Sequence, residues 1–85
     1  MRTFEKKWDQ LEKKNCIVIV RHMLFGKQIY DCNMLKIIND EHRIGVIIKG
    51  RELFIKKKDI VDFWMYDNTY HVRDNMLKIA IVNKM

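Results

Sequence analysis

Cationic side chains gather around a predicted β-hairpin at residues 43–56, and their types and spacing suit a chemical role better than any others in the chain. Lys49 and Arg51 flank its turn, and Lys56 and Lys57 stand where its second strand ends. Lysine and arginine side chains held on a rigid element can contact successive phosphates and release their condensed counterions. The pattern favours a polyanionic partner, and lysines that only protect an edge strand from aggregation would produce it equally well.

Aromatic side chains near the hairpin and after it could complete a nucleic-acid site. Single-stranded nucleic acids stack their bases on exposed aromatic rings. The rings that could serve, if they face solvent, are those of Tyr30, Phe54, Trp64 and Tyr66. The alternative is that Phe54 and Trp64 belong to the core or to an interface, in which case the neighbouring lysines serve solubility alone.

The histidines and cysteines lack the spacings of a metal site. His22, His42, His71, Cys16 and Cys32 include no CxxC or HxxxH pair, which are the spacings that usually hold a metal. The chain also contains no serine, and its three glycines stand apart, so it has no nucleophilic serine motif and no phosphate-binding loop. We therefore expect no catalytic residue, no metal and no small-molecule cofactor, and we expect that the protein is not an enzyme.

Composition indicates one small domain over residues 1–85. The sequence contains no proline, and 17 Lys and Arg against 11 Asp and Glu give a net charge of +6. Such a balance favours acidic partners, nucleic acid among them. The hydrophobic fraction of 48% is large for a domain of this size. We expect part of this apolar surface to lie between copies in a homo-oligomer.

The N-terminal segment is charged throughout, so it does not resemble a signal peptide. The longest apolar runs, such as residues 16–20, are too short to span a bilayer. These features predict a cytoplasmic protein with no membrane partner.

One helix followed by strands is the predicted order of elements. Phe4, Trp8 and Leu11 recur on one helical face, which predicts an amphipathic helix at residues 4–14. After it, β-branched and aromatic residues alternate between turn formers, so residues 16–83 are predicted to form five to seven short antiparallel strands. Short connections between such strands are typical of a small closed β-barrel.

The hairpin resembles the second motif of the Sm-like family, which includes Hfq. Residues 48–55, IKGRELFI, are similar to the Ile-Arg-Gly-type turn that links the last two strands of that barrel. Residues 53–60, LFIKKKDI, are similar to the last conserved segment of Hfq. Asp31, Asn33 and Leu35 match part of the first Sm motif.

The resemblance implies a mainly β fold in which an N-terminal helix lies on a small, strongly bent antiparallel β-barrel, here with an extra C-terminal hairpin. It also implies a ring homo-oligomer formed by edge-strand pairing, and non-catalytic binding of single-stranded RNA. The positions that match the family's RNA-binding segments are Lys49, Arg51, Lys56, Lys57, Asp31 and Asn33. Residues 52–60 are also similar to PRC-barrel domains. A non-catalytic protein-interaction or structural barrel, as in a viral or mobile-element assembly, is therefore the alternative.

Overall fold

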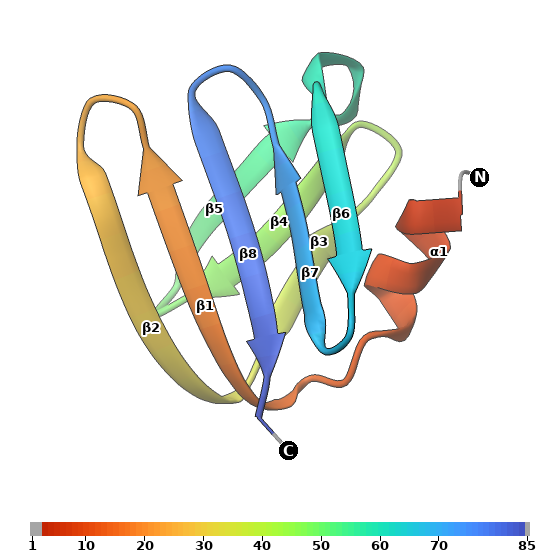
Figure 1. Cartoon of the computed structure of the whole chain (residues 1–85), viewed down its shortest axis with the longest axis vertical. Helices are drawn as coiled ribbons and strands as arrows, with labels where there is room; N and C mark the ends of the chain where they lie inside the picture. The colour runs from red at the N-terminus through yellow and green to blue at the C-terminus, as the bar shows by residue number, and fades with distance from the viewer. Residues whose placement is uncertain (1–2, 85) are drawn as a thin grey trace.

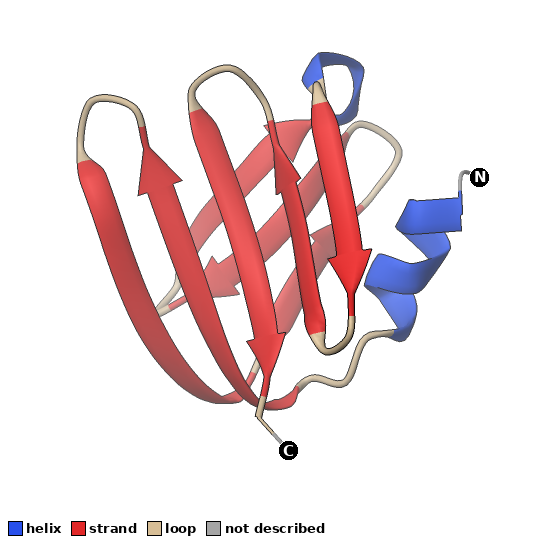
Figure 2. Cartoon of the chain, in the orientation of Figure 1, coloured by secondary structure: helices blue, strands red, loops and turns tan. Residues whose placement is uncertain are grey.

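The computed structural model describes residues 3–84 as a mainly β fold with one N-terminal helix (Figures 1 and 2). The elements are, in chain order, α1 (Thr3–Gln10), β1 (Lys14–His22), β2 (Gly26–Met34), β3 (Lys36–Asn39), β4 (Arg43–Ile48), β5 (Arg51–Lys56), the short 3₁₀ turn η1 (Lys57–Asp59), β6 (Asp62–Tyr66), β7 (Thr69–Arg73) and β8 (Leu77–Asn83). The predicted mainly β class with a helix in front is confirmed, but residues 3–84 contain eight strands where five to seven were predicted.

The strands form two antiparallel sheets rather than one closed barrel. The larger sheet has the order β2-β1-β8-β7-β6, and the smaller has the order β3-β4-β5. The chain passes from one sheet to the other at the buried Leu35, whose N–H donates to the Lys13 carbonyl at 2.6 Å. Within residues 3–84 no strand pairing joins the two sheets, so the closed barrel predicted over residues 16–83 is not formed by these strands.

The core lies between the inner faces of the two sheets. Alternation along each strand points one set of apolar side chains inward, as the period of two in a strand requires. The inward side chains of the larger sheet include Cys16, Val18, Val20, Val72, Ile79 and Ile81, and those of the smaller sheet include Ile44, Val46, Ile48 and Ile55.

Helix α1 is shorter than the predicted helix at residues 4–14, because it ends at Gln10. The Glu12 carboxylate accepts the backbone N–H groups of Lys13 and Lys14, each at 3.1 Å. This local bonding turns the chain into β1, where Lys14 pairs with β2. A side chain that bonds its neighbours' backbone competes with helical bonding, and here it ends the helix one turn early.

The apolar stripe of α1 packs where β6 approaches the smaller sheet (Figure 1). The Phe4 ring stacks on Phe63 of β6 with a centroid distance of 4.2 Å. Trp8 is buried, and its Nε1–H donates to the Gly45 carbonyl at 3.1 Å. A Cβ at Gly45 would overlap the backbone of Leu53 on the neighbouring strand. The glycine therefore lets β4 and β5 pass closely under the indole.

The two predicted hairpins with tight turns are present. Lys49 and Gly50 join β4 to β5 with φ values of 52° and 77°, the left-handed pair expected of a two-residue hairpin turn. Asp67, with φ of 58°, makes the turn between β6 and β7. After that C-terminal hairpin, β8 returns to pair with both β7 and β1.

Candidate nucleic-acid interface

The four cations predicted around the β4–β5 hairpin lie at opposite ends of it. Lys49 and Arg51 lie at the turn, whereas Lys56 and Lys57 lie where β5 runs into η1. Strand β5 rises about 3.3 Å per residue, so roughly 17 Å of strand separates the two ends. The structure therefore divides the predicted site into two clusters.

The cluster at the end of β5 borders a hollow of about 580 Å³, which we call the lysine groove. Its walls are formed by Glu41, His42, Arg43, Phe54, Lys56, Lys57 and Lys58. Lys57 contributes little free charge, because its Nζ lies 3.5 Å from the Glu5 carboxylate and only 15% of its side chain is exposed. Lys56 and Lys58 are exposed and form no ion pair within residues 3–84.

Arg43 in the lysine groove is also held by carboxylates. Its guanidinium lies 2.8 Å from Asp40 and 3.5 Å from Glu52, and it covers the Phe54 ring at 5.0 Å from the centroid. The backbone N–H of His42 and the Arg43 side chain bond the Asp40 carboxylate and lower its pKa from 3.8 to about 2. One face of the Phe54 ring is thus already occupied by a paired cation.

The predicted residues of the first motif lie elsewhere. Asp31 on β2 is exposed, and its carboxylate accepts a bond from the Lys84 Nζ at 2.8 Å. Asp31 and Lys49 border a common hollow of about 250 Å³ between β2 and β4. Asn33 is exposed on β2, and neither β2 residue borders the lysine groove. The structure therefore brings Lys56 and Lys57 together, and separately Asp31 and Lys49.

A second cationic surface lies on the outer face of the five-stranded sheet, and we call it the basic row. It consists of Arg73 on β7, Lys78 on β8, Arg21 on β1 and Lys27 on β2. Each is the direct cross-strand partner of the next: Arg73 faces Lys78, Lys78 faces Arg21, and Arg21 faces Lys27. At about 4.8 Å between strands, the row extends for roughly 15 Å.

Three of the four cations in the basic row have no carboxylate partner within the part of the chain that the structure describes: Arg21, Lys27 and Lys78. Arg73 lies 3.8 Å from Asp62, which is its cross-strand neighbour at the β6 end of the row. The row therefore carries more uncompensated charge than the lysine groove.

An aromatic and apolar row lies two residues along the strands on the same outer face, and we call it the aromatic row. Its members in cross-strand order are Trp64, His71, Ala80, Ile19 and Ile29. The Trp64 side chain is 44% exposed, and its ring stacks on His71 with a centroid distance of 5.2 Å. Tyr66, 68% exposed, also stacks with Trp64, with a centroid distance of 5.7 Å.

The ionisation of His71, a member of the aromatic row, depends on the charged side chains beside it. Its Nε2 lies 3.9 Å from Asp62. Desolvation, together with the charge of Lys78, lowers the pKa of His71 below its ordinary value of 6.5, while Asp62 opposes the shift. The imidazole is therefore neutral at pH 7, and it presents an uncharged ring beside Trp64.

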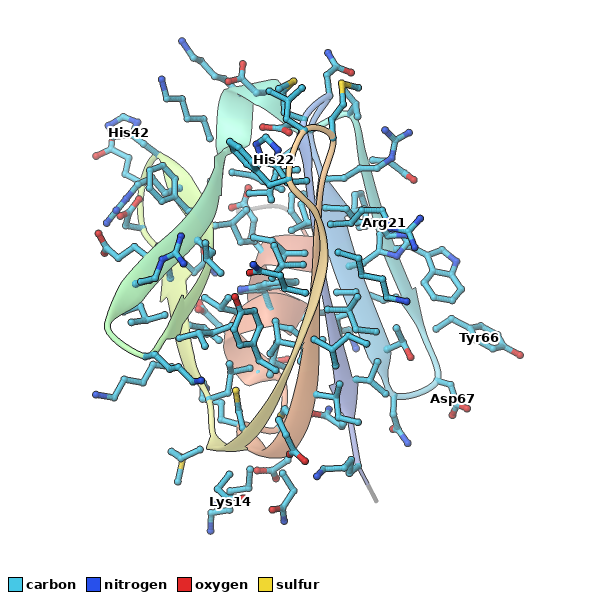
Figure 3. All side chains as sticks on the ribbon, turned by 90° about the vertical axis from the view of Figure 1, so that its left-hand side faces the viewer. Lys14, Arg21, His22, His42, Tyr66 and Asp67 are labelled. Carbon is cyan, nitrogen blue, oxygen red and sulfur yellow. The ribbon has the colours of Figure 1, made fainter. Side chains whose placement is uncertain are left out.

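The basic row and the lysine groove lie on opposite sides of the molecule. Figure 3 shows Arg21 and Tyr66 projecting from one side and His42 from the other. Of the four predicted stacking rings, Trp64 and Tyr66 face solvent, Phe54 is 36% exposed beneath Arg43, and Tyr30 is half-buried.

The sequence interpretation missed the basic row. Its four members lie at positions 21, 27, 73 and 78, so no local cluster of charge marks them. Arg21, Arg73 and Lys78 each adjoin a buried apolar side chain on their strand, which assigns them to the outer face, and Lys27 is placed there as the cross-strand partner of Arg21. Their alignment depends on the register of four strands, and that register is set by turns and pairings distant in sequence.

The two thiols of the described chain have raised pKa values, and its ionisable side chains form no cluster that could hold a metal ion. Burial raises the pKa of Cys16 and Cys32, so both thiols are protonated at neutral pH. Among residues 3–84, no three His, Cys, Asp or Glu side chains are arranged to hold a metal ion. Nor does that part of the chain contain a helix long and apolar enough to cross a membrane.

Comparisons of the chain with protein-family models, with curated proteins and with solved structures give no match.

Proposed function

We propose that this protein binds single-stranded nucleic acid, with RNA as the natural polymer, on the outer face of its five-stranded sheet and without catalysing a reaction. The phosphates would lie along the basic row, and the bases would stack over the aromatic row. The choice of RNA rests on the resemblance of residues 48–60 to the Sm-like family.

The basic row is the single observation that carries this proposal. Like charges placed directly opposite each other on neighbouring strands destabilise a sheet, yet Lys78, Arg21 and Lys27 face one another in succession. Their repulsion opposes folding in the free protein and would be relieved by a bound polyanion. Each phosphate contact would also release condensed counterions.

The aromatic row supplies the second half of the recognition. Base–aromatic stacking contributes about 1–3 kcal/mol per base in single-stranded complexes. Trp64 and Tyr66 present exposed rings, two and four residues along β6 from Asp62, which faces Arg73 of the basic row. Bases in a duplex are stacked on each other and cannot reach such rings, which favours a single-stranded ligand.

A ring homo-oligomer, as the resemblance to the Sm-like family implies, is a further part of the proposal. The outermost strands of the two sheets, β2 and β6 in one and β3 and β5 in the other, each have one unpaired edge within the described chain. Pairing between different edges of successive copies would close a ring and protect those edges. Light scattering of the purified protein measures this, and a monomer mass at micromolar concentration would contradict the ring.

Titration of labelled oligo-U and oligo-A RNA, followed by anisotropy at two salt concentrations, tests the binding function. We expect affinity that falls steeply with salt, and much weaker binding of a duplex of the same length. The matched variants are Arg21→Gln/Lys78→Gln on the sheet and Lys56→Gln/Lys58→Gln in the lysine groove, which remove the same charge. Binding that the sheet variant leaves unchanged would contradict the proposed surface, and absence of binding at low salt would contradict the function.

A further inference from the structure

One end of the molecule exposes an unusual amount of apolar surface. The loop between β1 and β2 carries Met23, Leu24 and Phe25, which are 70%, 70% and 80% exposed. Met76 in the β7–β8 loop and Val61 after η1 are 42% and 49% exposed. We call these five side chains the apolar tip. Contiguous exposed apolar surface in a protein marks a site of contact with a partner or a membrane.

The loops that carry the apolar tip are held together at the same end of the fold (Figure 1). The N–H of Met23 donates to the Met76 carbonyl at 2.8 Å. Val61 and Met76 border a common hollow with Lys58. The tip is therefore one surface built from three connections.

The β1–β2 loop is held by its own bonds with its apolar side chains outward. The His22 Nδ1 accepts the N–H of Leu24 at 3.0 Å, and the His22 ring packs on Phe25 with a centroid distance of 4.6 Å. Gly26 takes a φ of 83° and completes the turn. The exposure of Leu24 and Phe25 is thus fixed by local structure.

Cations stand immediately behind the apolar tip. Arg21 and Lys27 face each other across the hairpin, one pair below its last paired residues, and Lys78 pairs with Arg21 on the next strand. Each of these three cations lies two residues from the nearest tip side chain in the sequence, which is about 7 Å at 3.3 Å per residue. Lys58 is the exposed cation beside Val61.

The carboxylates at this end do not neutralise those cations. Asp74 turns its Oδ1 into its own loop, where it accepts the N–H groups of Met76 and Leu77 at 2.8 and 2.7 Å. Asp59 lies beside Lys58, next to η1. Within residues 3–84 neither acid pairs with Arg21 or Lys27. The end is therefore apolar at its tip and positive behind it.

We propose that the apolar tip inserts into the surface of an anionic lipid bilayer. Shallow interfacial binding combines buried apolar side chains with cations at the depth of acidic headgroups, and the tip presents the two in that order. Met23, Leu24 and Phe25 are the most exposed large apolar side chains among residues 3–84, and acidic headgroups would complement the cations behind them. This contact differs from spanning a membrane, and it runs against the sequence expectation of no membrane partner.

The membrane proposal and the nucleic-acid proposal use the same cations but differ in the other side chains that they require. Arg21, Lys27 and Lys78 belong to the basic row as well as to the surroundings of the tip, so acidic lipid and nucleic acid would compete for them. Leu24 and Phe25 contribute to the membrane contact alone. Substitutions of these two side chains therefore separate the membrane proposal from the nucleic-acid function.

Co-sedimentation with vesicles of phosphatidylcholine, with and without phosphatidylserine, tests the membrane contact. We expect the protein to bind the acidic vesicles, and Leu24→Ser/Phe25→Ser to lower its partition coefficient at least about tenfold. Met34, an exposed methionine on β2 outside the tip, gives the matched control Met34→Ser, which should bind as the parent does. Oligo-U affinity of the double variant should be unchanged.

A fluorescence measurement tests insertion of the tip directly, rather than through the loss of vesicle binding in a variant. Phe25→Trp in a Trp64→Phe background should bind acidic vesicles, and its emission should shift to the blue as the new indole leaves water. Failure to bind acidic vesicles, or no shift on binding, would overturn the proposal. So would a double serine variant that binds as well as the parent, or one that instead converts a dimer to a monomer, since the tip would then be an interface between copies.

Discussion

The lysine groove and the basic row contain the same number of cationic side chains, but they differ in how those charges are compensated. In the groove, Lys57 is bound by Glu5, and Arg43 is bound by Asp40 and Glu52. In the row, only Arg73 has a carboxylate partner among residues 3–84. The row also lies beside exposed stacked aromatic rings, whereas the rings among residues 3–84 that border the groove are those of His42 and of Phe54, which lies under Arg43.

The comparison shows that charge density in a sequence is a poor measure of free charge on a surface. Residues 56–58 are the most conspicuous cationic run in the chain, but one member serves to attach η1 to α1 through Glu5. The four cations of the basic row are dispersed, and antiparallel pairing aligns them. Variants of the two surfaces distinguish binding that follows the alignment of cations from binding that follows their local density in the sequence.

The largest expected effect comes from neutralising the basic row. Arg21→Gln/Lys27→Gln/Lys78→Gln should lower affinity for oligo-U about 100-fold at moderate salt and reduce the salt slope by about 2, since each phosphate contact contributes about 0.7. Anisotropy titration over a range of salt measures both quantities. The control removes equal charge from exposed sites elsewhere through Lys6→Gln/Lys7→Gln/Lys36→Gln. If the control loses as much affinity as the basic-row variant, net charge and not the basic row explains the binding.

Loss of the stacking ring should have the next largest effect on binding. Trp64→Ala should weaken oligo-U binding about tenfold, since one stacked base contributes about 1–3 kcal/mol, and it should leave the salt slope unchanged. Phe54→Ala is the matched aromatic substitution in the lysine groove and should have little effect. If the two variants lose equal affinity, the groove shares in base binding.

Lys57 should matter for stability rather than for binding. Lys57→Met leaves the Glu5 carboxylate, 12% exposed, without its partner, and an unsatisfied buried group costs about 1–3 kcal/mol. Urea unfolding should show a loss in that range, with oligo-U affinity unchanged when measured on folded protein. If Lys57→Met is as stable as the parent but binds oligo-U weakly, Lys57 contacts RNA directly and this prediction is wrong.

A single substitution in the basic row should act in opposite directions on stability and binding. Lys78→Gln relieves repulsion with Arg21 and Arg73, its cross-strand neighbours, so the free energy of unfolding should rise by about 0.2–1 kcal/mol. The same variant should bind oligo-U more weakly. Destabilisation by Lys78→Gln at low salt would show that the row carries no uncompensated repulsion.

The smallest effect is a pH dependence in the lysine groove. The pKa of Asp40 is lowered from 3.8 to about 2, so its contribution to stability is complete above about pH 4 and is lost as the pH falls toward 2. The stability difference between the parent and Asp40→Asn should therefore be constant near neutrality and vanish in acid. Urea unfolding at several pH values measures it, and a difference that persists at pH 2 would contradict the ionised pairing.

Local signals predicted most of the elements correctly. Alternation and the turn between the two strands of the predicted hairpin at residues 43–56 placed β4 and β5. The helix was predicted too long. The hydrogen bonds that the Glu12 carboxylate accepts from the following backbone end the helix, and they leave no mark in the hydrophobic periodicity from which the helix was predicted. The separation into two sheets depends on the connection at Leu35 between β2 and β3. No hydrophobic periodicity in the sequence marks that position as the point where the chain leaves one sheet for the other.

The candidate site was predictable only in part. Trp64 and Tyr66 were candidates for stacking, but their outward direction follows from the pairing of β6 with β7. Arg21 and Lys78 are partners across strands separated by most of the chain. Such neighbours are set by register, and a single sequence carries little information on long-range register.

The most direct test of the sheet-face account is tryptophan fluorescence during titration with oligo-U. The chain has two tryptophans: Trp8 is buried beside Gly45, and Trp64 is exposed on the outer face. Stacking of bases on the aromatic row should quench the red-shifted emission of Trp64 in a saturable, salt-dependent way, and Trp64→Phe should abolish the quenching. Saturable binding by anisotropy with no quenching of Trp64 would contradict the account.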